Sequence, residues 1–276
     1  MKNSEVTRVV HGKPAVDGAG VRLNRVLGGN TIEDFDPFLM LDSFDSRNPE
    51  DYIRGFPMHP HRGIETITYL VAGEIAHEDS LGNKGLITSG ACQWMTAGSG
   101  ILHQEMPQEA ERLLGLQLWL NLPAAEKMTT PKYFDIEPQD KGLVEENGGF
   151  VKVISGEYKG VRGVTPHHIQ ATLLDVKLDE GQGIEIPVKP GETVFVFLIE
   201  GAGMLNGEIF EEKTALLLGE GELVEVCALP GEVVRFILAS APPLHEPVAW
   251  GGPIVMNTRE ELQLAFDELR AGTFIK

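Results

Sequence analysis

Short apolar runs broken by glycine or proline recur along almost the whole chain, and this pattern constrains the fold more than any other feature. The first half carries TITYLV (66–71), GLITSG (85–90) and LLGLQLWLNL (113–122), and the second half carries TVFVFLIEG (193–201) and EVVRFIL (232–238). Such runs, rich in β-branched residues and separated by turn residues, predict antiparallel strands rather than strand–helix–strand units. We therefore expect an all-β protein built from barrels or sandwiches.

An acidic, glycine-rich stretch interrupts this pattern near the middle of the chain. Residues 137–149 read EPQDKGLVEENGG and contain few large apolar side chains, so they predict a linker. A chain of 276 residues is long enough for two domains. We predict an N-terminal barrel over residues 1–136 and a C-terminal barrel over residues 149–276. The runs ETITYLVAGEI and ETVFVFLIEGAGM suggest two copies of one architecture, although they are too dissimilar to define a repeat.

One helix is expected, near the C-terminal end. Thr258 and Glu261 form the T-x-x-E pattern of a capping box, and Gly272 is a typical stop. Apolar residues follow the cap at helical spacing: Leu262, Ala265, Phe266 and Leu269. This stripe predicts a surface that packs against a barrel.

The charge balance and the small number of cysteines exclude several classes of protein. Forty-one acidic against twenty-three basic residues give a formal charge of −18, which repels phosphate backbones and anionic lipids. We therefore expect no direct nucleic-acid or membrane binding. No signal-peptide pattern and no apolar run near the ~20 residues of a membrane span occur, so a cytoplasmic location is expected. Cys92 and Cys227 are too few for a disulfide framework and are expected to be buried thiols.

Two separate segments carry pairs of potential metal ligands. His59 and His61 are two residues apart, so both imidazoles point to the same face of a strand. Prolines at positions 57 and 60 cannot donate to a strand ladder, which predicts a strand end or edge near a barrel mouth. His103 and Glu105 repeat the two-residue spacing after the glycine-rich TAGSGIL (96–102). The four side chains together are predicted to form one site with three nitrogen donors and one oxygen donor.

The chemistry of these side chains suits a reactive metal site. Imidazole and carboxylate favour iron, zinc, copper, nickel or manganese, and the lack of thiolate argues against a purely structural zinc site. A five- or six-coordinate ion with four protein ligands keeps one or two positions for water, dioxygen or substrate. From the spacing alone, a different interpretation stays open, because an H-x-H pair on a strand is more often a surface or core pair than a ligand set.

Glu65 is a rival carboxylate, because H-x-H-x-x-x-E is also a recurrent ligand spacing. On a continuous strand Glu65 would lie about 13 Å from His61, at ~3.3 Å per residue, which is too far to share one ion. A turn at Arg62-Gly63 could bring it closer, so Glu65 stays an alternative ligand or a residue that orients one. We prefer Glu105. The remaining histidines are expected in surface or hydrogen-bonding roles: His11, His77, His167, His168 and His245.

The segment around these ligands resembles the pirin family of the cupin superfamily. The likeness covers residues 58–105, MHPHRGIETITYLVAGEIAHEDSLGNKGLITSGACQWMTAGSGILHQE, while DPFLMLDSF (36–44) and EPVAWGGPIVMNT (246–258) resemble the family's N- and C-terminal segments. The resemblance implies two cupin barrels, the first holding one divalent metal ion through three histidines and a glutamate. Fe(II) is the expected ion, with manganese, nickel, copper, cobalt or zinc as alternatives. Matched residue by residue, the ligands are His59, His61, His103 and Glu105.

The second half departs from a metal-binding cupin. An alignment of its glycine turns with those of the first half places Pro187 and Lys189 against the first ligand pair. The same comparison places Phe236 and Leu238 against the second pair. Neither set can bind a metal ion, so we expect this barrel to be a structural partner that closes the pocket.

The resemblance implies an enzyme similar to quercetin 2,3-dioxygenases, which open the central ring of a flavonol with dioxygen and release carbon monoxide. The metal would bind the 3-hydroxyl oxygen and lower its pKa, and Glu105 could take the proton as a general base. The alternative is a regulatory protein, because some pirins are implicated as cofactors of transcription regulators and the oxidation state of a metal could act as a redox signal. The acidic charge suits a basic protein partner better than DNA.

Overall fold

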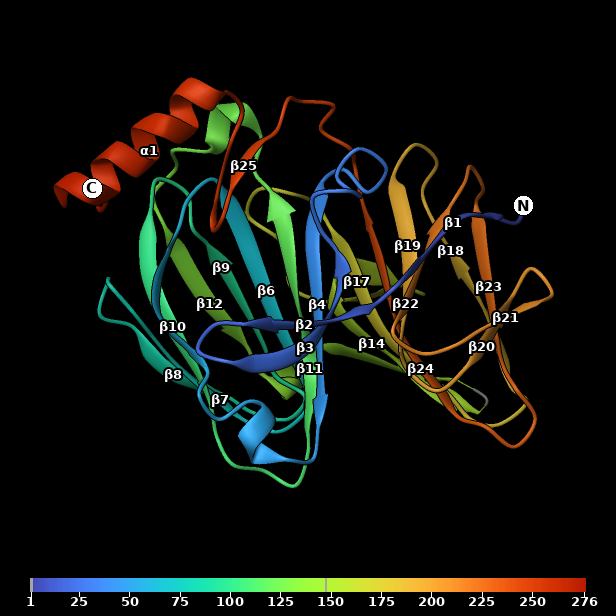
Figure 1. Cartoon of the computed structure of the whole chain (residues 1–276). Helices are drawn as coiled ribbons and strands as arrows, with labels where there is room; N and C mark the ends of the chain where they lie inside the picture. Colours follow the sequence, from blue (N-terminus) through green and yellow to red (C-terminus); the bar gives the residue numbers. More distant parts are fainter. Residues whose placement is uncertain (1, 147) are drawn as a thin grey trace. The chain divides into compact units, whose positions relative to one another are not determined.

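The computed structural model describes residues 2–146 and 148–276, which form two compact β units (Figure 1). The first, called the N-terminal barrel, consists of residues 14–29, 38–137 and 244–276. The second, called the C-terminal barrel, consists of residues 30–37 and 138–243 and the segment up to residue 13. The predicted all-β architecture, with two barrel units and one C-terminal helix, is confirmed.

Two antiparallel sheets build the N-terminal barrel. The larger has the strand order β12 (Lys132–Ile136), β9 (Cys92–Thr96), β6 (Ile64–Ala72), β11 (Leu113–Asn121), β4 (Phe38–Ser46), β3 (Val21–Leu27) and β2 (Lys13–Asp17). The smaller has the order β5 (Phe56–His61), β10 (Ile101–Pro107), β7 (Ile75–Asp79) and β8 (Lys84–Ile87). Short 3-10 turns lie at Pro49–Asp51 and Ala124–Glu126. The hairpin β25 (Ala249–Gly251)–β26 (Ile254–Met256) and helix α1 (Arg259–Ala271) complete the unit.

Buried and more exposed side chains alternate along the strands of this barrel, so that one face of each strand points to the interior. In β10 the side chains of Ile101, His103 and Glu105 are buried, and the residues between them are partly exposed. One end of the interior is apolar and is packed by Val21, Phe44, Leu70, Ile75 and Leu113, among others. The polar ligand candidates therefore lie on inward positions of a strand whose neighbours supply a hydrophobic core.

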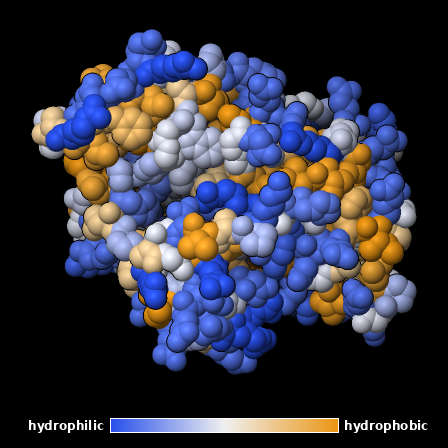
Figure 2. Space-filling view, in the orientation of Figure 1, coloured by the Kyte–Doolittle hydropathy of each residue, from blue (hydrophilic) through white to orange (hydrophobic). Residues whose placement is uncertain are grey.

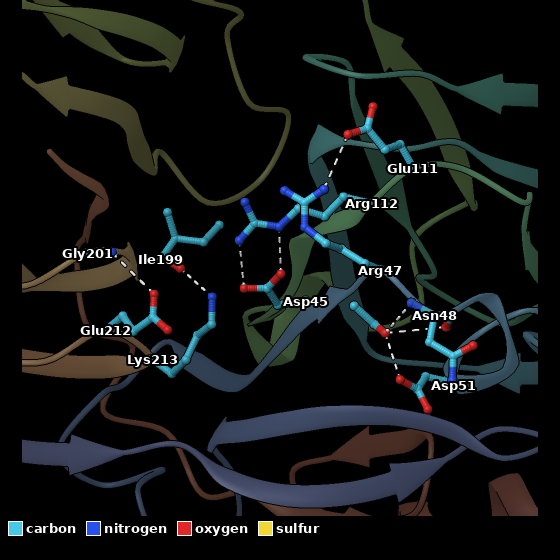
Figure 3. Close-up of polar contacts among 11 residues, drawn as sticks. Asp45, Arg47, Asn48, Asp51, Glu111, Arg112, Ile199, Gly201, Glu212 and Lys213 are labelled. Carbon is cyan, nitrogen blue, oxygen red and sulfur yellow. Dashed lines mark hydrogen bonds and ion pairs between the residues drawn. The ribbon is translucent and has the colours of Figure 1, made fainter.

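Ion pairs tie the end of strand β4 to β11 on the surface of the N-terminal barrel. Figure 3 shows the Arg112 guanidinium on the Asp45 carboxylate, at 2.8 and 2.9 Å. Arg47 contacts Glu111 at 3.3 Å nearby, and the Glu111 side chain keeps 94% of its surface exposed. An exposed pair such as Arg47–Glu111 contributes little to stability. Glu111 is therefore a convenient position for changing charge without changing the fold.

The C-terminal barrel repeats the same two-sheet plan. Its larger sheet has the order β1 (Val6–His11), β22 (Thr214–Leu218), β19 (Thr193–Glu200), β24 (Val234–Ala241), β17 (Thr172–Leu178), β14 (Gly149–Ser155) and β13 (Gly142–Glu146). Its smaller sheet has the order β18 (Gly183–Pro187), β23 (Leu223–Ala228), β20 (Gly203–Leu205) and β21 (Glu208–Phe210). A 3-10 turn (Pro138–Asp140) and the pair β15 (Glu157–Tyr158)–β16 (Val161–Arg162) lie outside these sheets.

Strand order corrects the alignment of the two halves made from glycine turns. Strand β19 lies between β22 and β24 as β6 lies between β9 and β11, so the two-copy architecture is real. By the same order β24 matches β11, and the counterpart of β10 is β23. Placing Phe236 and Leu238 of β24 against His103 and Glu105 was therefore wrong. The inward residues on β18 and β23 are aliphatic and belong to the apolar core of this barrel: Ile184, Ile186, Val224 and Val226.

The boundaries of the units differ from the predicted division at residues 1–136 and 149–276. Part of the expected linker forms β13, which pairs with β14. Strand β1 pairs with β22, so the start of the chain belongs to the C-terminal barrel. Helix α1 belongs to the N-terminal barrel. Contiguity in sequence is a poor guide at these points, because an edge strand or a packing helix can join any sheet with a free edge or face.

The C-terminal helix has the predicted ends and packing. The Thr258 hydroxyl accepts from the Glu261 N–H at 3.1 Å, the Glu261 carboxylate accepts from the Thr258 N–H at 2.9 Å, and Gly272 has a φ of 73°. Ala265 is buried with Ile254, Met256 and Phe274. Cys92 is buried as predicted, whereas Cys227 is only partly buried. Hydrophilic residues predominate on the face shown in Figure 2. Within the described residues, no helix is long and apolar enough to cross a membrane.

Candidate metal centre

Three histidines meet on the inner face of the β5–β10 pair. His103 lies directly opposite His59 in the ladder, and His61 lies two residues further along the same face. Their potential ligand atoms all lie within 4.8 Å of one another. The ring centroids are 4.4 to 4.9 Å apart. The expectation that two distant H-x-H and H-x-E segments lie side by side is therefore confirmed by the strand pairing.

Backbone carbonyls determine how two of these imidazoles are protonated. His59 Nδ1 lies 2.9 Å from the Pro57 carbonyl oxygen, and His61 Nδ1 lies 3.0 Å from the Pro253 carbonyl oxygen. A carbonyl can only accept, so each Nδ1 carries a proton, and Nε2 is the atom of each ring that is left to bind an ion. The two Nε2 atoms are 3.0 Å apart. When both nitrogens are unprotonated, their lone pairs repel each other at this separation unless a cation lies between them.

The third histidine shows the same need for a partner. His103 is buried, and its Nε2 has no hydrogen-bond partner within the described parts of the chain. Burial lowers the pKa of both His61 and His103 well below the usual range, and the neighbouring imidazoles lower it further. Both rings therefore stay neutral and offer lone pairs. The donor set fits a divalent transition-metal ion, and the three histidines could hold one.

Glu105 is inward-facing and buried, but it is held by other side chains. Its Oε1 accepts from the Thr68 hydroxyl at 2.9 Å, and its Oε2 accepts from Gln117 Nε2 at 2.7 Å. Among the residues that the structure describes, the group of close ligand atoms contains the three histidines and not Glu105. Each carboxylate oxygen retains a second lone pair, so the fourth-ligand role of Glu105 stays a prediction.

The structure also places Glu65, the alternative carboxylate, and His77. Glu65 accepts a hydrogen bond from the Thr96 hydroxyl at 2.7 Å. Thr68, which contacts Glu105, lies three residues further along the same strand, so the two side chains point to opposite faces of the sheet. Glu65 is therefore unsuited to share an ion with the histidines. His77 does form a hydrogen bond, to the Tyr133 hydroxyl, but it also lies directly opposite Glu105 in the β7–β10 ladder. Burial lowers the pKa of His77.

A cavity of about 530 Å³ opens beside the histidine cluster, within the usual range for small-molecule sites. The rings of Trp119 and Trp250 lie 5.9 Å apart, and Trp119 stands edge-on to His61 at 5.0 Å. His59, His61 and Glu105 form one part of the wall. The rest of the lining combines apolar with charged or amide side chains: Met40, Phe56, Pro57, Asp17, Arg25, Asp42 and Gln117.

The hairpin β25–β26 supplies Trp250 and Pro253 to this wall, and two buried cations fix its surroundings. Lys127 Nζ donates to the carbonyls of Gly63 and Val255 at 2.8 and 3.0 Å, and to Asn121 Oδ1 at 2.6 Å. Arg62 donates to the carbonyls of Ser99 and Phe274 and pairs with Glu268 at 2.7 Å. The residues just after His61 therefore bind the C-terminal segment whose carbonyl orients His61.

Several of these residues carried no signal in the sequence. Thr68, Gln117, Trp119 and Trp250 stand in strands that read as ordinary apolar-rich runs. Their importance comes from cross-strand register, since Gln117 lies opposite both Thr68 and Asp42 in the larger sheet. Register of this kind is set by the whole sheet and cannot be read from one strand.

Comparisons with known proteins agree with this geometry. The family model described as Pirin matches residues 20–120, and the model described as Pirin C-terminal cupin domain matches residues 173–275. The chain is 44% identical to a Pseudomonas aeruginosa protein provisionally named quercetin 2,3-dioxygenase, over 97% of both chains. It is 38% identical to human pirin, over 97% of this chain and 93% of that one. A crystal structure of quercetin 2,3-dioxygenase from Acinetobacter baumannii has a TM-score of 0.89 at 33% identity and covers 99% of this chain and 98% of that one.

Proposed function

The chain belongs to the pirin family, and on this premise we propose that it is a metal-dependent dioxygenase that cleaves a flavonol or a similar aromatic enol with dioxygen. The observation that carries the proposal is the buried three-histidine cluster beside an aromatic-walled cavity. The names of the Pseudomonas and Acinetobacter relatives support the same reaction class. A cytoplasmic location, with a small aromatic substrate and dioxygen as partners, accompanies this proposal.

The proposed ligands are the four side chains that the spacing singled out. Three histidine nitrogens come from β5 and β10, and Glu105 supplies the oxygen from the adjacent inward position of β10. Fe(II) is the preferred ion, because a nitrogen-rich set with one carboxylate and a vacant position suits iron and dioxygen chemistry. When bound, the ion supplies positive charge beside the enol oxygen of the substrate and lowers its pKa.

The protein side chains would position the substrate and take its proton. Glu105 faces the cavity from beside the histidines and acts as general base toward the enol hydroxyl. The amide of Gln117 and the hydroxyl of Thr68 hold its carboxylate in place. Trp119 and Trp250 flank a planar ring and keep bulk water from it. Orientation in a dry pocket is thus the main contribution of the chain.

Alanine substitutions at the centre test this proposal. We expect His61→Ala to lose the metal, and both His61→Ala and Glu105→Ala to abolish loss of the flavonol absorbance in air. Elemental analysis and a spectrophotometric assay with quercetin measure the two effects. His167→Ala, at an exposed histidine of the C-terminal barrel, is the matched control and should keep metal and turnover. Normal turnover by a metal-free variant would contradict the proposal.

The alternative is a non-enzymatic regulatory protein that responds to its metal and binds a protein partner. The formal charge of −18 favours this second candidate, because it suits contact with a basic surface. The same quercetin assay separates the two functions. If iron-loaded protein consumed no flavonol and released no carbon monoxide, the regulatory role would be favoured.

A further inference from the structure

One wall of the cavity carries an ion cluster that the proposed chemistry does not use, the Asp17–Arg25–Asp42 triad. Arg25 and Asp42 lie opposite each other on β3 and β4. Arg25 Nε donates to Asp42 Oδ1 at 2.9 Å, and Nη2 donates to Asp42 Oδ2 at 2.7 Å. Nη2 also donates to Asp17 Oδ2 at 2.6 Å. All three residues line the same cavity as His59, His61 and Glu105.

Asp17 is held at this wall by the turn that follows β2. Its Oδ1 accepts from the Gly18 N–H at 2.7 Å, and the Ala19 N–H donates to the Gly55 carbonyl at 3.0 Å. Gly18 has a φ of +56°, and a Cβ there would lie 2.6 Å from the Gly55 oxygen and from the Phe56 ring. Only glycine permits this approach. The turn is therefore fixed against β5, the strand that carries His59 and His61.

The triad has hydrogen-bonding capacity to spare. A guanidinium has five N–H donors, and the three on Nε and Nη2 are engaged by the two carboxylates. Among residues 2–146 and 148–276, no acceptor is recorded for Arg25 Nη1, and 38% of the Arg25 side chain remains exposed. The Asp17 side chain is 49% exposed, whereas that of Asp42 is 5% exposed. Donors of Arg25 and an acceptor of Asp17 therefore remain available to a ligand.

The charge of this part of the cavity and its aromatic walls limit the chemical class of ligand that can bind there. Two carboxylates and one guanidinium sum to −1, so a carboxylate group on the ligand is disfavoured. Although burial raises the pKa of Asp17, the hydrogen bonds from Arg25 and Gly18 and the charge of Arg25 outweigh it, and the net pKa is lowered. Asp17 is therefore an ionised acceptor at neutral pH. A hydroxyl can both donate and accept, and the nearby aromatic walls suit a planar ring.

We propose that the Asp17–Arg25–Asp42 triad is a subsite for neighbouring hydroxyl groups on an aromatic ring of the substrate. One hydroxyl donates to the Asp17 carboxylate, and the other accepts from Arg25 Nη1. Asp42 acts as a positioning residue, because it fixes the guanidinium from the buried side. This inference rests on the proposed function. The subsite would favour flavonols with neighbouring hydroxyls on the pendant phenyl ring over flavonols whose phenyl ring carries no hydroxyl.

Binding of two matched flavonols tests the subsite separately from turnover. Quercetin carries two adjacent hydroxyls on its pendant phenyl ring, and galangin is the same flavonol without these two hydroxyls. Dissociation constants are measured on metal-loaded protein without dioxygen, by quenching of tryptophan fluorescence, since Trp119 and Trp250 line the cavity. We expect the wild type to bind quercetin about tenfold more tightly than galangin, because hydrogen bonds to charged groups are the strong ones.

Variants of Asp17 should weaken the binding of quercetin and leave that of galangin unchanged. Asp17→Ala leaves the Arg25–Asp42 pair intact and should weaken quercetin binding about tenfold, with galangin binding unchanged. Asp17→Asn, which still accepts from the Gly18 N–H, should move the preference in the same direction. Glu111→Ala removes the same charge at an exposed position outside the cavity and should leave both constants unchanged.

Two results would overturn the subsite. One is equal binding of quercetin and galangin by the wild type, and the other is equal weakening of both by Asp17→Ala. Failure of the proposed function looks different. In that case neither flavonol is consumed when dioxygen is admitted, while the binding preference and its loss in Asp17→Ala are still measured.

Discussion

At the scale of single residues, the position of Glu105 depends on neutral partners from the opposite sheet. Thr68 on β6 and Gln117 on β11 donate to its two oxygens, and Gln117 accepts from Trp119 Nε1 at 3.0 Å. Partners of this kind orient a ligand, and removing one typically costs 10–100-fold in metal affinity or activity. We expect Gln117→Leu and Thr68→Val each to weaken metal binding by a factor in this range.

Competition with a chromogenic chelator measures that affinity. Thr66→Val is the matched control, because Thr66 is as buried as Thr68 and lies on the same face of β6, but it has no recorded contact with Glu105. It should leave the metal affinity unchanged. Equal affinity in Thr68→Val and the wild type would show that Glu105 needs no such support.

The residues that could be predicted are those whose own spacing carries the signal. His59 and His61, like His103 and Glu105, are two apart on one strand, so a shared face follows from strand geometry alone. Asp17, Arg25, Thr68 and Gln117 have no such spacing, because each acts through a neighbour on another strand or turn. His77 has the hydrogen bond that was expected of it, to Tyr133, but only the β7–β10 register shows that it lies opposite Glu105.

At the scale of elements, the hairpin β25–β26 is tied to the segment after His61 by the buried Lys127 ammonium. Burial lowers the pKa of Lys127 from 10.5 to about 8. Because the folded state holds this proton less tightly, the unfolded state binds more protons between pH 8 and 10.5. The free energy of unfolding should therefore rise with pH across this window, by about 3 kcal/mol from this group.

The difference between the wild type and Lys127→Met isolates this contribution. The variant lacks the titrating group and leaves three buried acceptors unpaired, so it should be less stable at neutral pH by about 2–4 kcal/mol. Urea unfolding from pH 7 to 10.5 should show the gap widening as pH rises. Lys132→Met, which removes an exposed lysine of β12, is the matched control and should cost much less stability at neutral pH. A gap that does not widen with pH in Lys127→Met would contradict the assignment.

Which elements form was more predictable than which elements associate. Short apolar runs between turn residues predicted strands such as β6, β11, β19 and β24, while the capping box predicted the start of α1 and Gly272 predicted its end. The pairing of β1 with β22 joins positions about 200 residues apart, and part of the expected linker forms β13. These associations are decided by which sheet edges remain open after the barrels form, and a single sequence does not show that.

At the scale of the whole molecule, each end of the chain belongs to the unit that is built mainly from the other half of the sequence. Residues 244–276 belong to the N-terminal barrel, and β1 belongs to the C-terminal barrel. Removing either end should therefore loosen the unit that is distant in sequence. Deletion of residues 2–11 opens an edge at β22. Deletion of residues 259–276 removes two partners of Arg62, namely Glu268 and the Phe274 carbonyl, and leaves the Ser99 carbonyl.

Hydrogen exchange read by mass spectrometry resolves the two effects by peptide. After deletion of residues 2–11, exchange should rise in β22 and β19, while β5 and β10 stay protected and the metal content is unchanged, because the histidines share no sheet with β1. After deletion of residues 259–276, exchange should rise at the end of β5 and in β26, and metal should be lost more readily, because Arg62 follows His61 directly. Equal increases of hydrogen exchange in β5 and β10 after both deletions would contradict this prediction. The metal-binding strands would then depend on both ends of the chain alike, and not on the C-terminal segment in particular.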